Sequence, residues 1–288
     1  MKQNMRQKNM QAYLFLSPFL VFITVLYILP AILTVIMAFT SLDSAFIWKF
    51  NGINNFRKIL MDPNTPIIAW NTIKYVGITI FLTVVLDLFF AIMTTYFIRD
   101  ERKGNIFKGI LMIPMITPAV VYSVLWLWLL EATPNGLANK VYMALGGSEP
   151  LNWIAQYPFV IIIAATLLTS IAYGTTVFSS AVKSIPENQF RAARVDGAGE
   201  WEIVRNIILP NLRFHITFIA LWETLGLLTN YVTIMLITNG GPGVQTEVWA
   251  LSAYHKAFSD SQYGYGAAIS LVLIVVVMVL MLVIGAVM

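Results

Sequence analysis

The sequence contains no cysteine and few charged residues. Only 11% of its 288 residues are charged, whereas soluble globular domains carry roughly 25%, so an ordinary soluble domain is excluded. Without cysteine, the chain has neither disulfides nor thiolate metal ligands. The motifs H-E-x-x-H, G-x-S-x-G and G-x-x-x-x-G-K-S/T are absent, and His215 and His255 stand alone without metal-ligand spacing. We therefore expect no enzyme active site, no metal site and no P-loop for ATP.

Apolar residues make up 58% of the chain and gather in long runs. A helix needs roughly 20 apolar residues to cross a hydrocarbon core of about 30 Å. Runs of this length cover residues 13–39, 76–98, 109–130, 157–182, 216–237 and 265–288. Asp87 and Glu223 are the only charges inside them. The sequence therefore predicts an all-α integral membrane protein with six transmembrane helices.

Basic residues are distributed unevenly among the connecting segments. Twelve of the eighteen Lys and Arg residues lie in the N-terminal segment and in segments 99–108 and 183–213. Short loops rich in Lys and Arg stay in the cytoplasm, so both termini are predicted to be cytoplasmic. The first apolar run is too long for a signal peptide, and we interpret it as an uncleaved anchor. Met288 ends the chain inside an apolar run, and we expect a short tail beyond it.

Tryptophan and proline mark the ends and the interiors of the predicted helices. We interpret the tryptophans near the outer helix ends as interfacial anchors; they are Trp48, Trp70, Trp126, Trp128, Trp153 and Trp249. Pro30 lies in the first run, and Pro114 and Pro118 lie in the third. Because proline removes a helical hydrogen bond, we expect these helices to break or kink.

The connection between the fourth and fifth runs is predicted to form two short helices. Ser184-Ile185-Pro186-Glu187 has the form of a capping box with proline in the first turn, so a helix should begin there. Gly197 should end this helix. A second helical stretch should cover residues 200–209 and stop at Pro210.

The predicted helical pair carries apolar residues among its charges. Phe190, Ala192 and Ala193 suit insertion into a groove on a partner protein. The alternative interpretation is a helix that lies in the membrane interface.

The segment 185–210 closely resembles a family signature. Binding-protein-dependent ABC importer permeases carry E-A-A, three residues, G, nine residues and I-x-L-P. The matching positions are Ala192, Ala193, Gly197, Ile207, Leu209 and Pro210. Arg191 stands where the family usually places glutamate. The resemblance implies the transmembrane fold of type I ABC importers, with cytoplasmic coupling helices. It also implies that residues of this loop dock on an ATPase subunit: Arg191, Ala192, Ala193, Asp196 and Gly197.

A second stretch, 236–258, resembles the carbohydrate branch of these permeases. It contains T-x-G-G-P, with Gly240, Gly241 and Pro242 in a predicted outer loop. The resemblance implies uptake of a sugar, such as an oligosaccharide. A non-sugar solute such as glycerol phosphate is an alternative. An ion-coupled secondary transporter is less well supported, because the Gly-Gly-Pro stretch has no counterpart elsewhere in the chain.

The resemblance also implies partners and a location. Residues 1–68 are assigned to the N-terminal cytoplasmic segment, the first helix and an outer loop. Residues 69–288 are assigned to the permease domain, with a coupling loop at 184–213. The expected partners are a second, homologous permease, two ATPase subunits and an external solute-binding protein. ATP and Mg²⁺ belong to the ATPase subunits, and this chain, in a bacterial cytoplasmic membrane, is expected to hold no cofactor and no nucleic acid.

Polar residues inside the apolar runs are candidates for the transport path. A charge near the bilayer centre costs about 3 kcal/mol, so Glu223 should face a cavity and Asp87 should pair with a neighbouring helix. The other path candidates are Thr229, Asn230 and Tyr231 in the fifth run and Tyr173 in the fourth, with Thr175 and Thr176 as weaker candidates. The alternative is that these residues only bond to neighbouring helices.

Overall fold

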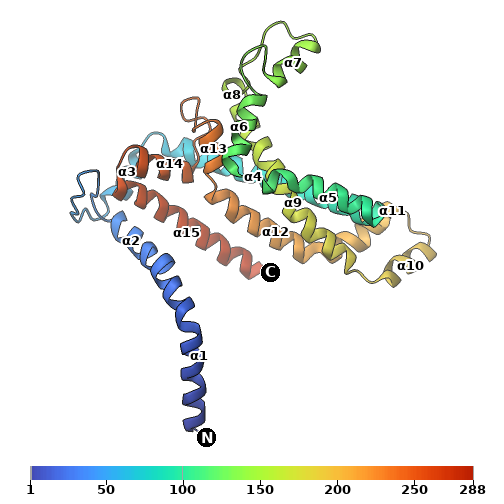
Figure 1. Cartoon of the computed structure of the whole chain (residues 1–288), viewed down its shortest axis with the longest axis horizontal. Coiled ribbons are helices and arrows are strands. Elements are labelled where there is room, and N and C mark those ends of the chain that lie inside the picture. The colour runs from blue at the N-terminus through green and yellow to red at the C-terminus, as the bar shows by residue number, and fades with distance from the viewer. Residues whose placement is uncertain (1, 99, 288) are drawn as a thin grey trace. The chain divides into compact units, whose positions relative to one another are not determined.

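The computed structural model describes residues 2–98 and 100–287, so Met1, Arg99 and Met288 lie outside the described residues. The described chain consists of helices joined by loops (Figure 1), and its extended pairing is an isolated bridge between Thr40 and Phe50. The chain divides into two compact units. The first contains residues 1–62 and 252–275, and the second contains residues 63–251 and 276–288.

The first unit is built from a long N-terminal helix and the start of the last helix. Its elements are α1 (Lys2–Ile23), the π-turn η1 (Thr24–Ile28), α2 (Leu29–Ala38), α3 (Asn54–Met61), the π-turn η4 (His255–Ser259) and the first part of α15 (Tyr263–Val287). The Asn55 side-chain amide donates to the Ala38 and Thr40 carbonyls at 2.9 and 2.8 Å. The Gly264 N–H donates to the Leu42 carbonyl at 2.8 Å. These bonds fix the chain that follows α2.

The second unit has α9 at its centre, packed against α4, α5 and α12. Its elements are α4 (Thr65–Ile92), η2 (Met93–Phe97), α5 (Glu101–Ile116), α6 (Ala119–Leu129), α7 (Leu137–Ala144), α8 (Trp153–Gln156), α9 (Pro158–Lys183), α10 (Glu187–Val195), α11 (Glu200–Ile203), η3 (Val204–Ile208), α12 (Leu209–Thr229) and α13 (Val232–Ile237). Both α14 (Trp249–Tyr254) and α15 contain a boundary between the units. A buried apolar cluster joins α4, α9, α12 and the 185–208 segment.

The contact between α4 and α9 contains hydrogen bonds between polar side chains. The Tyr75 hydroxyl lies 3.0 Å from the Thr166 hydroxyl. Asp87 is fully buried, and its Oδ1 accepts from the Thr175 N–H at 2.8 Å and from the Thr175 hydroxyl at 3.0 Å. A side chain at Gly174 would overlap the Asp87 carboxylate. Asp87 thus pairs with a neighbouring helix, as its depth in the second run predicts.

The long apolar helices match most of the predicted runs. Four helices in the described chain are long and apolar enough to cross a membrane: 13–38, 65–97, 158–183 and 263–283. The third predicted run is divided between α5 and α6, which are bent by 96°. The fifth run is divided between α12 and α13. Because α12 contains Arg213, His215 and Glu223, it is less apolar, and the total of six spans stays a prediction.

Proline acts in two ways on these helices. At Pro118 the chain breaks as predicted, and α6 starts at the following residue. At Pro30 and Pro210 the helix continues, because a π-turn precedes each proline. The Leu29 and Leu209 N–H groups donate five residues back, to Thr24 and Val204. The wider turn accommodates the proline ring without a break, so the predicted stop at Pro210 is wrong.

Candidate functional site

The candidate site begins with the elbow, which we define as residues 184–208, containing α10, α11 and η3. The predicted capping box at its start is wrong. Ser184 instead follows the last turn of α9, and its hydroxyl donates to the Ala181 carbonyl at 2.7 Å. Pro186 then occupies the N-cap position of α10. Because α9 extends to Lys183 and Ser184 is its C-cap residue, α10 starts at Glu187 without a side-chain cap.

The turn between the two elbow helices depends on glycine. Gly197 follows α10 with φ +85°, a left-handed conformation that ends helices and that other residues adopt at a cost. The predicted end of this helix at Gly197 is therefore confirmed. The Glu202 carboxylate then accepts from the Gly199 N–H at 2.8 Å at the start of α11. These local interactions fix the bend.

The inner side of the elbow packs on the end of α4. Phe190 is only 6% exposed, and its ring lies 5.6 Å from the ring of Tyr96 in η2. The Tyr96 hydroxyl donates to Glu200, and the Arg194 guanidinium lies 3.4 Å from the same hydroxyl. Ile203 is also buried there. The expectation that Phe190 inserts into a partner is wrong, because Phe190 anchors the elbow to its own bundle.

The outer side of the elbow presents most of the predicted docking residues. Arg191, Ala192, Asp196 and Gly197 are exposed, and Ala193 is half-buried. Their exposure is compatible with docking on an ATPase subunit, and this docking stays a prediction.

Two exposed apolar side chains of the elbow were not predicted. Val195 is 87% exposed and Trp201 is 72% exposed. The helical period could have placed Val195, since it lies five residues from Phe190 and therefore off the buried face.

The path candidates lie on α9 and α12, the helix that the elbow leads into. Tyr173 lies 6.3 Å from Trp222 between ring centres, and Glu223 follows Trp222 on α12. Glu223 is half-buried, and within the described residues its carboxylate has no hydrogen-bond partner. The structure thus places Tyr173 beside the α12 turn that carries Glu223.

The remaining candidates differ in position. The Thr229 hydroxyl donates to the Leu225 carbonyl at 3.0 Å, and α12 ends at this residue. Asn230 and Tyr231 form the break before α13, at the polar interruption seen in the sequence. Thr175 is buried against Asp87 and does not face an open space, while the Thr176 hydroxyl donates to Ala172 within its own helix.

The segment that contains the Gly-Gly-Pro loop is hydrogen-bonded to α4 in the second unit. Gly240 has φ +82°, and a side chain there would meet Glu247. The Gly241–Pro242 peptide is cis. The Asn71 amide donates to the Val244 carbonyl, and the Trp249 N–H donates to the Thr72 hydroxyl, both at 2.8 Å. Pro242 is exposed at the tip of the loop.

The structure brings together no metal-binding group among its described residues, where no three His, Asp or Glu side chains lie close enough to hold an ion. An exposed elbow leads through a continuous helical segment into a half-buried helix with one carboxylate. This arrangement suits transmission of movement and binding of a polar solute.

Comparisons with known proteins identify the family of this chain. Residues 87–288 match the family of binding-protein-dependent transport system inner membrane components. The chain is 27% identical to the trehalose/maltose transport system permease protein of Thermococcus litoralis over 88% of this chain and 85% of that protein. It is 26% identical to the arabinooligosaccharides transport system permease protein of Bacillus subtilis over 90% and 82%.

A solved structure shares the fold. It is that of a bacterial alginate ABC transporter in complex with an alginate pentasaccharide-bound periplasmic protein. The TM-score is 0.85 at 18% identity, covering 96% of this chain and 93% of that chain. The family match covers well over half of the sequence, and the resemblance to carbohydrate-uptake permeases is confirmed by these relatives. The chain therefore belongs to the family of binding-protein-dependent transport system inner membrane components and is a non-enzymatic permease subunit of an ABC importer.

Proposed function

We propose that this permease carries a sugar, such as an oligosaccharide, across a bacterial cytoplasmic membrane by alternating access. Both termini and the elbow face the cytoplasm. Two separate ATPase subunits supply the energy and hold ATP and Mg²⁺. A second, homologous permease completes the pathway, and an external binding protein delivers the sugar. In this scheme, ATP-driven closure of the ATPase subunits changes which side of the membrane the cavity faces.

The observation that carries this proposal is the attachment of an exposed elbow to the helix bundle through side-chain contacts and a continuous helical segment. Phe190 and Tyr96 join α10 to the end of α4, and Glu200 bonds to the same tyrosine. The π-turn η3 continues directly into α12. A displacement of the exposed side, at Arg191, Ala192, Ala193, Asp196 and Gly197, is therefore passed to α4 and to α12 together.

The solute path is supported by the chemistry of the candidate residues. A sugar offers hydroxyl groups to hydrogen-bond and C–H faces to lie against aromatic rings. Glu223, Asn230 and Thr229 supply hydrogen-bonding groups, and Tyr173 and Tyr231 supply rings with a polar tip. We assign these five residues to the path, with the outer loop motif Gly240, Gly241 and Pro242 at its entrance.

The alternative solute, glycerol phosphate, is disfavoured by charge. Glu223 is the acid of α12, and a carboxylate in a half-buried position repels a phosphate group. A neutral sugar meets no such repulsion and can donate hydrogen bonds to the carboxylate. The same residue thus favours the sugar.

The test is uptake by the assembled transporter. The permease is reconstituted in liposomes with its second permease, its ATPase and its binding protein, and labelled maltose, lactose, an arabino-oligosaccharide and glycerol 3-phosphate are supplied with ATP. We expect ATP-dependent accumulation of at least one of the sugars and no accumulation of glycerol 3-phosphate. Accumulation of glycerol 3-phosphate alone, or of no sugar, contradicts the proposal.

A further inference from the structure

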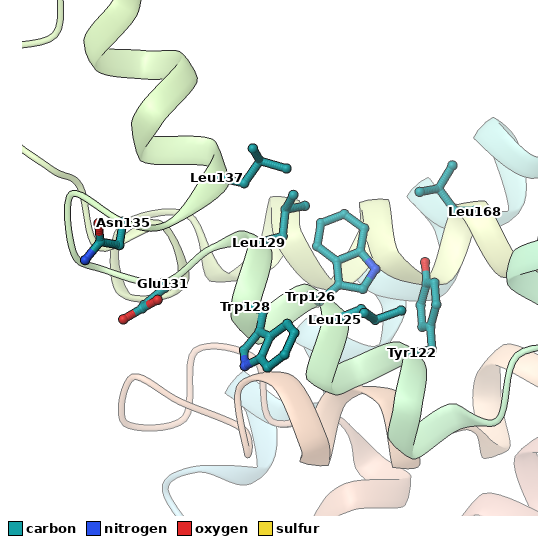
Figure 2. Close-up of a pocket in the computed structure, with 9 residues that line it drawn as sticks. All are labelled: Tyr122, Leu125, Trp126, Trp128, Leu129, Glu131, Asn135, Leu137 and Leu168. Atoms are coloured by element: carbon teal, nitrogen blue, oxygen red, sulfur yellow. The ribbon is translucent and has the colours of Figure 1, made fainter.

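A pocket lies at the end of α6, where the chain turns toward α7 and faces α9. Its volume is about 640 Å³, within the range of roughly 300–1,000 Å³ found for small-molecule sites. The lining residues are Tyr122, Leu125, Trp126, Trp128, Leu129, Glu131, Asn135, Leu137 and Leu168. Figure 2 shows Trp126 near the middle of this set, with Glu131 and Asn135 at one end and Tyr122 and Leu168 at the other.

The walls of the pocket are fixed before any ligand arrives. The Tyr122 hydroxyl donates to the Ala165 carbonyl at 2.7 Å, which ties α6 to α9. Asn139 is fully buried, and its amide nitrogen lies 2.9 Å from the Glu131 carbonyl. Its side-chain oxygen accepts from the Trp153 indole N–H at 2.9 Å. A side chain at Gly136 would overlap the Glu131 carbonyl, so the turn requires glycine. A preformed site loses less entropy on binding.

The polar groups of the pocket are available for a ligand. Glu131 and Asn135 are both exposed, and within the described chain neither side chain has a hydrogen-bond or ion-pair partner. The indole N–H of Trp128, a residue that is also exposed, adds a donor. The pocket thus combines flat aromatic surfaces with a carboxylate and an amide at one end.

This combination matches the surface of a sugar ring. A sugar ring has C–H faces that lie against aromatic rings and a rim of hydroxyl groups that bond to carboxylates and amides. A lipid acyl chain has no groups for Glu131 and Asn135 to bond. We propose that this pocket is a sugar-binding subsite for one neutral ring, separate from the α12 residues. The subsite rests on the proposed function, because it assumes a sugar as solute.

The position of the pocket gives the subsite a role in the transport sequence. The pocket includes Leu168 in the first half of α9, whereas the elbow follows the other end of that helix at Lys183. With the elbow in the cytoplasm, the pocket lies on the outer side. A ring bound there is held between its release from the delivery protein and its entry into the α12 path. Trp126 and Trp128, interpreted from the sequence as interfacial anchors, are thus assigned to solute contact.

The test uses the reconstituted transporter and the sugar that it accumulates among labelled maltose, lactose and an arabino-oligosaccharide. Trp126→Ala is expected to raise the KM for uptake by about tenfold, the loss of one aromatic contact, and Trp126→Phe to restore most of it. Glu131→Ala is expected to raise KM by about fivefold through loss of a charge-assisted hydrogen bond. Trp70→Ala is the control, since Trp70 is exposed on α4 and does not line the pocket. ATP hydrolysis without sugar is expected to stay unchanged.

The outcomes separate the subsite from the proposed function. If the wild-type transporter accumulates none of the sugars, the proposed function fails. If the wild type accumulates a sugar and Trp126→Ala and Glu131→Ala leave KM within about twofold, the subsite is overturned. A pocket filled by lipid or by the second permease gives this second result, with a loss of assembly or thermal stability in place of the KM change.

Discussion

The connections at the two ends of α9 are held in different ways. The elbow, after Lys183, is held by side chains of another helix, through Tyr96 against Phe190 and Glu200. The loop before α9 is held by a residue within itself, since Asn139 bonds to the backbone of its own connection. An element attached to its neighbours passes movement to them, whereas a self-contained loop keeps its shape. The elbow therefore suits mechanical coupling, and the other connection suits a fixed pocket.

The largest expected effect comes from releasing the elbow from the bundle. Phe190→Ala removes a buried ring and costs about 3–5 kcal/mol locally. We expect sugar-stimulated ATP hydrolysis by the assembled transporter to be lost, while the permease still inserts in the membrane. Hydrogen exchange of residues 187–203 should rise. Phe107→Ala is the control, because Phe107 is exposed on α5, and stimulation that survives Phe190→Ala would contradict the role of the anchor.

The corresponding change in the loop before α9 removes Asn139, the side chain whose hydrogen bonds hold this loop together. Asn139→Ala leaves buried carbonyl and N–H groups without partners, at about 1–3 kcal/mol each. We expect faster hydrogen exchange in residues 131–153 and a raised KM for uptake, with ATP hydrolysis in the absence of sugar unchanged. Asn105→Ala, at an exposed position of α5, is the control. Loss of the sugar-independent hydrolysis in Asn139→Ala would show that the two ends are not independent.

Substitution of one glycine in each connection compares the two ends of α9 under similar backbone strain. Gly197 in the elbow and Gly146 after α7 both have positive φ, at +85° and +103°, and open space around the missing side chain. Valine at either position adds backbone strain of about 1–3 kcal/mol. We expect Gly197→Val to reduce ATPase stimulation strongly and Gly146→Val to spare it. Equal losses in both variants would mean that general destabilisation, not docking, explains the effect.

The smallest expected effect compares the two acids that lie inside the apolar runs, the fully buried Asp87 and the half-buried Glu223. Glu223→Gln keeps the shape but removes the charge, and we expect a change in the KM for uptake of about threefold with unaltered thermal stability. Asp87→Asn should do the reverse, lowering the thermal unfolding temperature without changing KM, because among the described residues the Asp87 carboxylate accepts its hydrogen bonds from Thr175 of α9, and these bonds weaken when the acceptor loses its charge. A KM change in Asp87→Asn and none in Glu223→Gln would exchange the roles assigned to them.

The sequence predicts the elements that depend on local chemistry. Apolar runs predict the long helices, Pro118 predicts the break in the third run, and Gly197 predicts the end of α10. The π-turn before Pro210 was not predicted, because its i to i+5 bond depends on backbone geometry that the sequence pattern does not specify. The continuous path from the elbow into α12 was missed for the same reason.

The remaining differences between the prediction and the structure arise from contacts that the sequence pattern does not show. Phe190 was expected to face a partner, since the sequence alone does not show that Tyr96 lies beside it, ninety-four residues earlier. Asn139 gave no signal, because an asparagine in a loop is common and its five contacts come from residues 131–153. The pocket it supports was therefore absent from the predicted site.

The direct test of the central claim is whether the elbow and the bundle move as one body. Because the chain has no cysteine, spin labels attach only where a cysteine is introduced, here as Val195→Cys on the elbow and Thr229→Cys at the far end of α12. The distance between the labels is measured by electron–electron double resonance in the assembled transporter, with and without ATP. A label pair from Thr229→Cys to an ATPase subunit serves as the positive control and should change. We predict that the distance from residue 195 to residue 229 stays the same, and a shift of that distance on ATP binding would contradict the account.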